Sequence, residues 1–323
     1  MTSITMIDAA ALRLKGHARR TPLLSSPFLD EVAGRRVLVK AECLQHTGSF
    51  KYRGAWSAVS ALPEAIRMRG VIAFSSGNHA QGVALAASQH GVSAVIIMPS
   101  DAPAIKVANT RALGGEVILY DRANEDREAI GQRLSVSRGL TLIRPYDEPQ
   151  VIAGQGTTGL EIAEQAAEIG VNRADVVVCC GGGGLTSGIA LALEARAPGL
   201  RARTAEPEGF DDVARSLVSG RIERNQAAAG SICDAIVTPQ PGEITFPILR
   251  RLCGPGLCVS DDEALQAMAL AWARLRIVIE PGGAVALAAA LFRRDQIDGE
   301  AVVVVASGGN VDAGLFARAL ALI

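Results

Sequence analysis

The sequence predicts an α/β fold built on parallel sheets, and two patterns indicate it. Short apolar runs rich in β-branched residues recur, and each is typical of a strand buried on both faces: 37–39, 71–74, 94–98, 117–120, 176–178 and 302–305. Ala-rich segments that suit helices lie between them at 80–90, 160–169, 189–197 and 263–274. Strands that alternate with helices imply parallel sheets.

The composition narrows the class of protein and of partner. With 323 residues, of which 49% are hydrophobic and 20% charged, the chain can bury a large core in one domain or two lobes. A net charge of -1 without a run of Lys or Arg argues against nucleic acid or an anionic membrane as partner, so we expect a small molecule. The N-terminus resembles neither a signal peptide nor a membrane span, which predicts a cytoplasmic protein. The 6 cysteines form no CxxC pair, so a zinc site or disulfide framework is poorly supported.

A run of four glycines, Gly181, Gly182, Gly183 and Gly184, follows the buried strand at 176–178 and precedes a helical segment that begins with Leu185. Bare backbone amides and the positive end of the following helix can bind an anion. The run fits neither the dinucleotide spacing nor a nucleoside-triphosphate loop, so a single phosphate ester is the expected guest. A tight structural turn is the alternative.

Three further segments place polar residues after predicted strands. Lys51, in Gly-Ser-Phe-Lys, lies near a helix start, where the helix dipole and burial lower a lysine pKa toward imine chemistry, although a loop lysine is usually only solvated. Residues 75–79, Ser-Ser-Gly-Asn-His, are either helix caps or a carboxylate receptor. Ser307 follows the strand at 302–305, at the sheet edge where ligands gather in open α/β folds.

Together and in this order, these motifs resemble the fold-type II pyridoxal-phosphate enzymes, in particular the branch of threonine and serine dehydratases and serine racemases. Thr21-Pro22 and the Gly-Gln-Gly-Thr of 154–157 match the same family pattern, so the resemblance covers nearly the whole chain. It implies a tryptophan synthase β-like fold of two open α/β lobes, with the cofactor in the cleft between them. The large cofactor-binding lobe would comprise residues 1–50 and 150–323, and the small substrate-binding lobe residues 51–149. A homodimer or homotetramer is implied as well.

The resemblance also assigns site residues. It makes Lys51 the Schiff-base lysine, and it places Phe50 beside the pyridoxal phosphate ring, Asn78 at its 3-hydroxyl, residues 181–185 around its phosphate and Ser307 at its ring nitrogen. Ser76, Gly77, Asn78 and His79 would receive the substrate carboxylate. A cation site for Mg²⁺ or Ca²⁺ is implied at Glu206, Asp212 and the carbonyl of Phe210, with an acidic surface loop as the alternative. The chain departs from the family pattern at 233–235, Cys-Asp-Ala, and at 280–284, Glu-Pro-Gly-Gly-Ala, so the family's substrate choice does not transfer directly to it.

The expected activity is dehydration and deamination of a small β-hydroxy amino acid, L-threonine or L-serine, to a 2-oxo acid and ammonia. The neutral hydroxyl of Ser307 does not enforce a charged ring nitrogen as an Asp would, which favours elimination over transamination. Lys51 would remove the α-proton. Two enzyme alternatives share every motif: a racemase, with Ser76 as the acid on the face opposite Lys51, and a 3-hydroxyaspartate lyase, which needs a cationic partner such as Arg53 or His79. A non-catalytic sensor that binds an amino acid is the alternative from another class.

Overall fold

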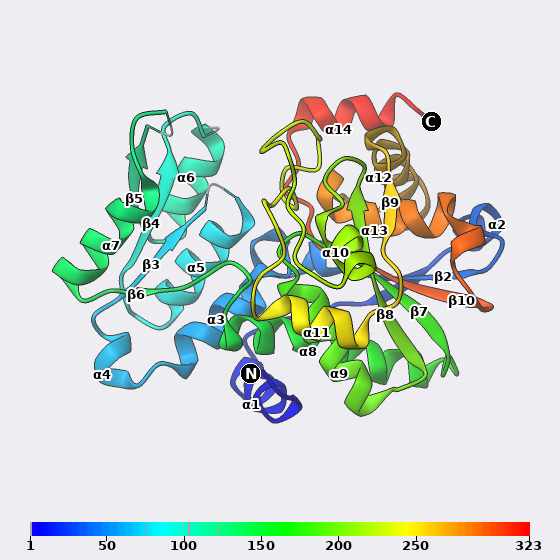
Figure 1. The fold of residues 1–323 in the computed structure, drawn as a ribbon, viewed down its shortest axis with the longest axis horizontal. Coiled ribbons are helices and arrows are strands. Elements are labelled where there is room, and N and C mark those ends of the chain that lie inside the picture. Colours follow the sequence, from blue (N-terminus) through cyan, green and yellow to red (C-terminus); the bar gives the residue numbers. More distant parts are fainter. Residues whose placement is uncertain (1, 76, 103, 122) are drawn as a thin grey trace.

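The apolar runs of the sequence form two separate sheets in a computed structural model that describes residues 2–75, 77–102, 104–121 and 123–323 (Figure 1). Within this part of the chain, one sheet has six strands in the order β1-β2-β10-β7-β8-β9 and the other has four in the order β5-β4-β3-β6. The strands are β1 (Leu23–Ser25), β2 (Arg36–Lys40), β3 (Val71–Phe74), β4 (Ala94–Pro99), β5 (Gly115–Tyr120), β6 (Thr141–Leu142), β7 (Ala174–Cys179), β8 (Leu200–Pro207), β9 (Leu257–Val259) and β10 (Ala301–Val305). Strands pair in parallel, except that β1 runs antiparallel to β2.

Helices cover both faces of the four-stranded sheet. Side chains from α3 (Lys51–Ala61) and α5 (Asn78–Gln89) form one core cluster with Val71, Ala73 and Ile96. The alternate residues of the same strands, Ile72 and Val95, point to the other face and pack with α7 (Arg127–Arg138). Because successive strand residues point to opposite faces, this double burial explains why these strands read as continuous apolar runs.

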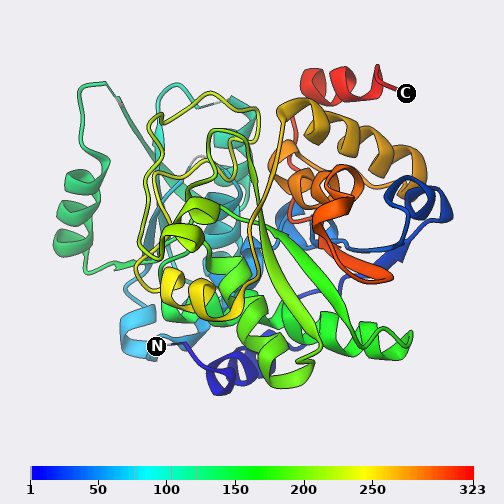
Figure 2. The same ribbon diagram turned by 45° about the vertical axis from the view of Figure 1, so that its right-hand side comes forward.

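The six-stranded sheet is covered in the same way, as the second view makes clear (Figure 2). One face packs on α2 (Pro27–Ala33), α12 (Asp261–Leu275) and α13 (Pro281–Phe292), and the other on α8 (Pro149–Glu168) and α9 (Gly184–Arg196). The other helices are α1 (Ile4–Leu14), α4 (Glu64–Arg67), α6 (Ala104–Ala112), α10 (Asp212–Ser219), α11 (Thr245–Leu252) and α14 (Ala313–Leu320), with short 3₁₀ turns at Glu42–Leu44, His46–Gly48 and Arg294–Gln296.

Helix α8 joins the two halves of the molecule, and the Gly-Gln-Gly-Thr motif lies in its N-terminal half. A Cβ on Gly154 would lie 2.4 Å from the carbonyl oxygen of Arg53 in α3, and one on Gly156 would lie 2.9 Å from that of Gly188 in α9. Side chains at these two positions would push the helices apart. The motif therefore serves helix packing and lies away from the cavity described below.

A buried ionic network fastens α3 to the rest of the fold. The guanidinium of Arg53 donates to both oxygens of Glu42, at 2.8 Å each, and to both oxygens of Glu161 in α8, at 2.7 and 2.9 Å. Lys40 adds a third partner, donating to Glu161 at 2.6 Å. The Arg53 side chain is 1% exposed and the Glu42 side chain 0%. Buried charges of this kind are tolerated because each is paired and hydrogen-bonded.

The segment before Lys51 pairs with the segment after β10. Ser49 and Gly308 form an antiparallel bridge, Phe50 donates from its N–H to the carbonyl of Ser307 at 3.0 Å, and Gly309 donates to that of Gly48 at 2.9 Å. Two motifs more than 250 residues apart in the sequence are thereby held side by side.

All strands of the four-stranded sheet lie between residues 71 and 142, and those of the other sheet lie outside that range. The exact division into lobes of 51–149 and of 1–50 with 150–323 remains our proposal. In the part of the chain that is described, no helix has the length and apolar character needed to cross a membrane.

Candidate active site

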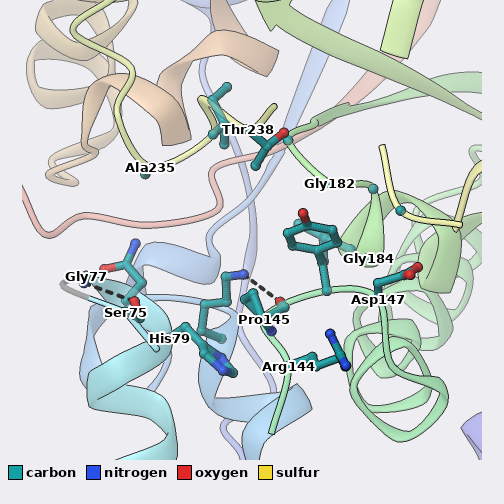
Figure 3. A pocket seen from close by; sticks show the side chains of 18 of the residues that line it. Ser75, Gly77, His79, Arg144, Pro145, Asp147, Gly182, Gly184, Ala235 and Thr238 are labelled. Carbon is teal, nitrogen blue, oxygen red and sulfur yellow. Dashed lines mark hydrogen bonds between the residues drawn. The ribbon is translucent and has the colours of Figure 1, made fainter. Parts of the chain in front are cut away.

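A cavity of about 970 Å³ lies between the two sheets, where the carboxyl ends of their strands face each other. Figure 3 shows how segments far apart in the sequence reach it: Ser75, Gly77 and His79 on one side, Gly182 and Gly184 on the other, and Pro145 between them. Ala235 and Thr238, from the long segment between α10 and α11, lie along a further wall.

The glycine run forms the turn from β7 into α9. Gly183 has φ 92°, a left-handed conformation that side chains other than hydrogen rarely adopt, and it immediately precedes the helix. Among the described residues, the N–H groups of 181–185 find no hydrogen-bond acceptor, and all five residues line the cavity. Several free donors at the positive end of a 13-residue helix make an anion site.

Lys51 is the first residue of α3 and lies in the same cavity. Its ammonium donates to the carbonyl of Pro145 at 2.8 Å and lies 5.2 Å from the centre of the Phe50 ring. Burial lowers the pKa of Lys51 to about 8, while the charge of Glu280 opposes the shift. A lysine with such a pKa supplies free amine near neutral pH, as a nucleophile or base must.

The N-terminus of α5 forms the opposite wall. Gly77 donates from its N–H to Ser75 Oγ at 3.1 Å, and Asn78 begins the helix. The ring of His79 is buried, with Nε2 2.9 Å from the carbonyl of Ile143, and burial together with the charge of Lys51 lowers the pKa of His79 to about 3. His79 is therefore a neutral ring at physiological pH. Ser76, which the sequence suggested as a second catalytic group, lies outside the described residues.

Glu280 is a further member of the site that sequence reasoning did not select. It immediately precedes α13, and its Oε1 accepts from Asn78 Nδ2 at 2.6 Å, while Asn78 Oδ1 accepts from Asn310 at 2.7 Å. Burial raises the pKa of Glu280 to about 7, and the hydrogen bond from Asn78 acts in the opposite sense. The sequence signal at this position is the Glu-Pro-Gly-Gly segment, where the chain departs from the family pattern.

Comparison with known proteins places this geometry in a family. The family model described as "Pyridoxal-phosphate dependent enzyme" matches residues 14–308. The chain belongs to the pyridoxal-phosphate-dependent enzymes.

The chain is similar over nearly its whole length to two relatives and to one solved structure of this family. The chain is 45% identical over 320 residues to an L-threo-3-hydroxyaspartate ammonia-lyase of Pseudomonas sp, covering 99% of both proteins. It is 41% identical to a serine racemase of Schizosaccharomyces pombe, covering 97% of this chain and 96% of the relative. The crystal structure of a T.th. threonine deaminase superposes with a TM-score of 0.90 at 44% identity, over 96% of this chain and 99% of that one. These matches confirm the predicted family and fold class, and the predicted cofactor, pyridoxal phosphate.

The cavity of this pyridoxal-phosphate-dependent enzyme fits its cofactor. The unpaired N–H groups of the glycine turn suit a phosphate, the Lys51 amine suits the aldehyde, and Phe50 and Ser307 line the space between them. Ser307 is buried and has a hydroxyl rather than a carboxylate. The individual roles of these residues, like those of Gly77, Asn78 and His79, remain proposals.

The expected cation site lies apart from the cavity. Glu206 is fully buried in β8, and its two carboxylate oxygens accept from the N–H groups of Val213 and Ala214 at 2.8 and 2.7 Å. Asp212 Oδ1 accepts from Asn225 at 2.6 Å, whereas Asp212 Oδ2 is buried without a partner in the described structure. An unpaired carboxylate oxygen beside a second buried acid fits a hard cation. Among the described residues, no group of three or more His, Cys, Asp or Glu side chains is arranged to hold a metal ion, so a site here needs the Phe210 carbonyl as well.

The structure thus brings most of the predicted residues into one cavity. Phe50, Lys51, Gly77, Asn78, His79, Gly181, Gly182, Gly183, Gly184, Leu185 and Ser307 all line it. Arg53, considered above as a cationic partner for a substrate, does not, because its guanidinium is used in the buried network of α3.

Proposed function

We propose that this chain is an ammonia-lyase that removes water and then ammonia from a small 3-hydroxy α-amino acid, leaving a 2-oxo acid. The observation that carries the proposal is the pairing, in one cavity, of a partly buried lysine of lowered pKa with an anion-binding glycine turn. Relatives named as ammonia-lyases, at 45% and 43% identity, support it.

The chemistry balances without an oxidant or reductant. The α C–H and β C–OH bonds break, water leaves, and hydrolysis of the resulting enamine, as its imine, consumes one water and releases ammonia. Pyridoxal phosphate, when bound, supplies an electron-withdrawing ring that stabilises negative charge at the substrate α-carbon.

Lys51 is the proposed base for the α-proton. Its lowered pKa makes the free amine available, and its hydrogen bond to the Pro145 carbonyl holds the amine inside the cavity. Phe50, Asn78 and Ser307 would hold the cofactor ring, and residues 181–185 its phosphate. The neutral Ser307 hydroxyl leaves the ring nitrogen without an ionic partner, which favours loss of a β-substituent over transamination.

The turn at the N-terminus of α5 is the proposed receptor for the substrate α-carboxylate. The peptide N–H groups at the start of this 12-residue helix suit an anion. His79 would take part through its backbone and its neutral ring, because its pKa excludes a positive charge. We also include Ser76 in this proposed receptor, on the basis of the sequence motif alone.

Racemisation is the second candidate, because a serine racemase is 41% identical over almost the entire chain. It needs an acid on the substrate face opposite Lys51, and Ser76 is the proposed donor. Incubation of L-serine with the enzyme, followed by measurement of pyruvate and D-serine together, separates the two. Faster production of D-serine than of pyruvate would replace the lyase proposal by racemase.

The direct test is Lys51→Ala. We expect the variant to lose 2-oxo acid formation and the visible absorbance of covalently held cofactor, with an unchanged far-ultraviolet circular dichroism spectrum. Lys15→Ala, at an exposed lysine that does not line the cavity, is the matched control and should behave as wild type. Undiminished turnover by Lys51→Ala would refute the assignment of the base, and a wild-type protein that holds an amino acid without turnover would support the sensor alternative.

A further inference from the structure

We propose that Lys106 is the receptor for a second substrate carboxylate, so that the preferred substrate is a 3-hydroxy dicarboxylic amino acid such as 3-hydroxyaspartate. This inference rests on the proposed lyase function and names its substrate class. Among the described residues, few cationic groups lie close enough to the cavity to bind such a carboxylate.

The two cations expected from the sequence are both excluded. Arg53 has its donors engaged by Glu42 and Glu161 within the core. His79 is neutral, and its Nε2 is committed to the carbonyl of Ile143. Lys51 is assigned to the cofactor and the α-proton, so a charged contact to a second carboxylate must come from Lys106, Arg127 or Arg144, the other lysine and arginines among the described residues that line the cavity.

Lys106 meets the requirement by position. It lies on α6, beside the four-stranded sheet, lines the cavity, and is 30% exposed. Its ammonium is 3.7 Å from Asp234 Oδ2. Asp234 lies in the segment between α10 and α11, in the half of the molecule that contains the six-stranded sheet. The pair therefore bridges the cavity from one half of the molecule to the other.

The pair lies at the Glu280 end of the cavity. The segment of Asp234 packs on the start of α13, since a Cβ on Gly282 would lie 3.2 Å from Ala235 Cβ and 3.6 Å from the Cys233 carbonyl. Lys106 and Asp234 also both act on the pKa of Glu280, with opposite signs. Because Glu280 contacts Asn78 at the start of α5, Lys106 is close to the proposed α-carboxylate receptor.

Two arginines also line the cavity wall, Arg127 and Arg144. Arg144 is two residues from Tyr146, whose ring packs directly on Gly182, so its charge favours the cofactor phosphate that the glycine turn is proposed to bind. Arg127 begins α7, which packs on the four-stranded sheet where Gly131 meets Phe74, and its replacement is a separate arm of the test below.

The resident partner of Lys106 is easily displaced. Asp234 is 72% exposed and its oxygen is 3.7 Å away, and ion pairs of such exposure contribute little. A substrate carboxylate held at its other end by the α5 turn would compete with Asp234 at high effective concentration. A monocarboxylic substrate such as serine would leave the Lys106–Asp234 pair in place.

The experiment compares kcat/KM for L-threo-3-hydroxyaspartate and L-serine, from 2-oxo acid release by the holoenzyme. We expect wild type to prefer hydroxyaspartate at least about tenfold, and Lys106→Gln to reduce that ratio by about 10- to 100-fold, the range for one charge-assisted hydrogen bond. Lys106→Arg should restore the preference, and Asp234→Asn should lower KM for hydroxyaspartate. Arg111→Gln, also on α6 but away from the cavity, is the control and should keep the wild-type ratio.

Three results would overturn the inference. An unchanged ratio in Lys106→Gln removes Lys106 from recognition, and loss of the preference in Arg127→Gln alone moves the receptor from α6 to α7. Equal or better turnover of serine by wild type refutes the dicarboxylate class while leaving the lyase function intact. Failure of wild type to convert either substrate would instead refute the proposed function itself.

Discussion

Replacement of Arg53 by alanine tests the buried network that anchors α3, the helix that begins with the cavity lysine. The change removes six hydrogen bonds, of which four go to Glu42 and Glu161 and two to Thr157 and the carbonyl of Arg19. Glu42, whose side chain is fully buried, is then left without its main counter-charge. Loss of one partner from a buried pair typically costs about 3 to 5 kcal/mol, because the remaining charge is uncompensated.

The size of the chain converts this cost into a shift of the melting temperature. Unfolding entropy near the midpoint is about 2.1 cal/mol/K per residue, or about 0.7 kcal/mol/K for this chain. We therefore expect the midpoint of Arg53→Ala to fall by about 4 to 7 °C. The assay is thermal unfolding followed by circular dichroism at a fixed excess of pyridoxal phosphate, since bound cofactor itself raises the midpoint.

Arg196→Ala is the matched control. Arg196 also contacts both oxygens of a carboxylate, Asp8, at 2.9 and 3.0 Å, but the two side chains are 51% and 41% exposed. Exposed pairs contribute up to about 1 kcal/mol, so the midpoint should fall by less than about 2 °C. Equal losses in the two variants would refute the argument from burial. Adding Glu42→Gln to Arg53→Ala should recover part of the loss, because it removes the uncompensated charge.

Three further measurements follow from the structure. Burial raises the pKa of Glu148 to about 7, so the contribution of Glu148 to stability is present below its unfolded pKa, near 4.5, and is lost as pH rises through 7. The melting temperature of Glu148→Gln minus that of wild type should therefore increase between pH 5 and 8, and a constant difference would contradict the shift. Gly183→Ala forces an alanine to φ 92° and to within 2.8 Å of Leu249, so its affinity for pyridoxal phosphate, titrated by absorbance, should fall at least about tenfold. Removal of divalent cations with a chelator should lower the melting temperature and Mg²⁺ or Ca²⁺ should restore it, an effect that Asp212→Asn should abolish; a wild-type protein indifferent to chelator would exclude the cation site.

The strands and the loops that follow them could be predicted from sequence because both signals are local. Strands buried on two faces appear as apolar runs, and all six predicted runs became strands of the two sheets. The motifs of Lys51 and Ser307 follow strands β2 and β10 of one parallel sheet, and such strand ends lie at one edge. Asn78 follows β3 of the other sheet, and it lines the same cavity as Lys51 and Ser307 because the two sheets face each other, which no local pattern encodes.

Strand β8 escaped prediction because it carries charges inside a sheet. Its Arg203 is 3% exposed and donates to Asp175 of the neighbouring strand β7 at 3.0 Å. A search for apolar runs does not detect a buried arginine whose partner lies 28 residues earlier in the chain. The same limit hid Glu280 and Lys106, because their significance comes from contacts with Asn78 and Asp234 that no local pattern encodes.

The position of β10 between β2 and β7 has a consequence for biosynthesis. Among the strands of the described residues, β10 is the last to be synthesised, so until residue 305 emerges, β2 and β7 each present an unpaired edge. The nascent chain can complete its smaller sheet early. The bridge between Ser49 and Gly308, which positions the segment before Lys51, forms only when β10 inserts between β2 and β7. We therefore expect the chain to bind its cofactor only after β10 has been synthesised and the larger sheet is complete. Until then, the larger sheet of the incomplete chain has a gap one strand wide in its middle, and exposed strand edges of this kind favour aggregation.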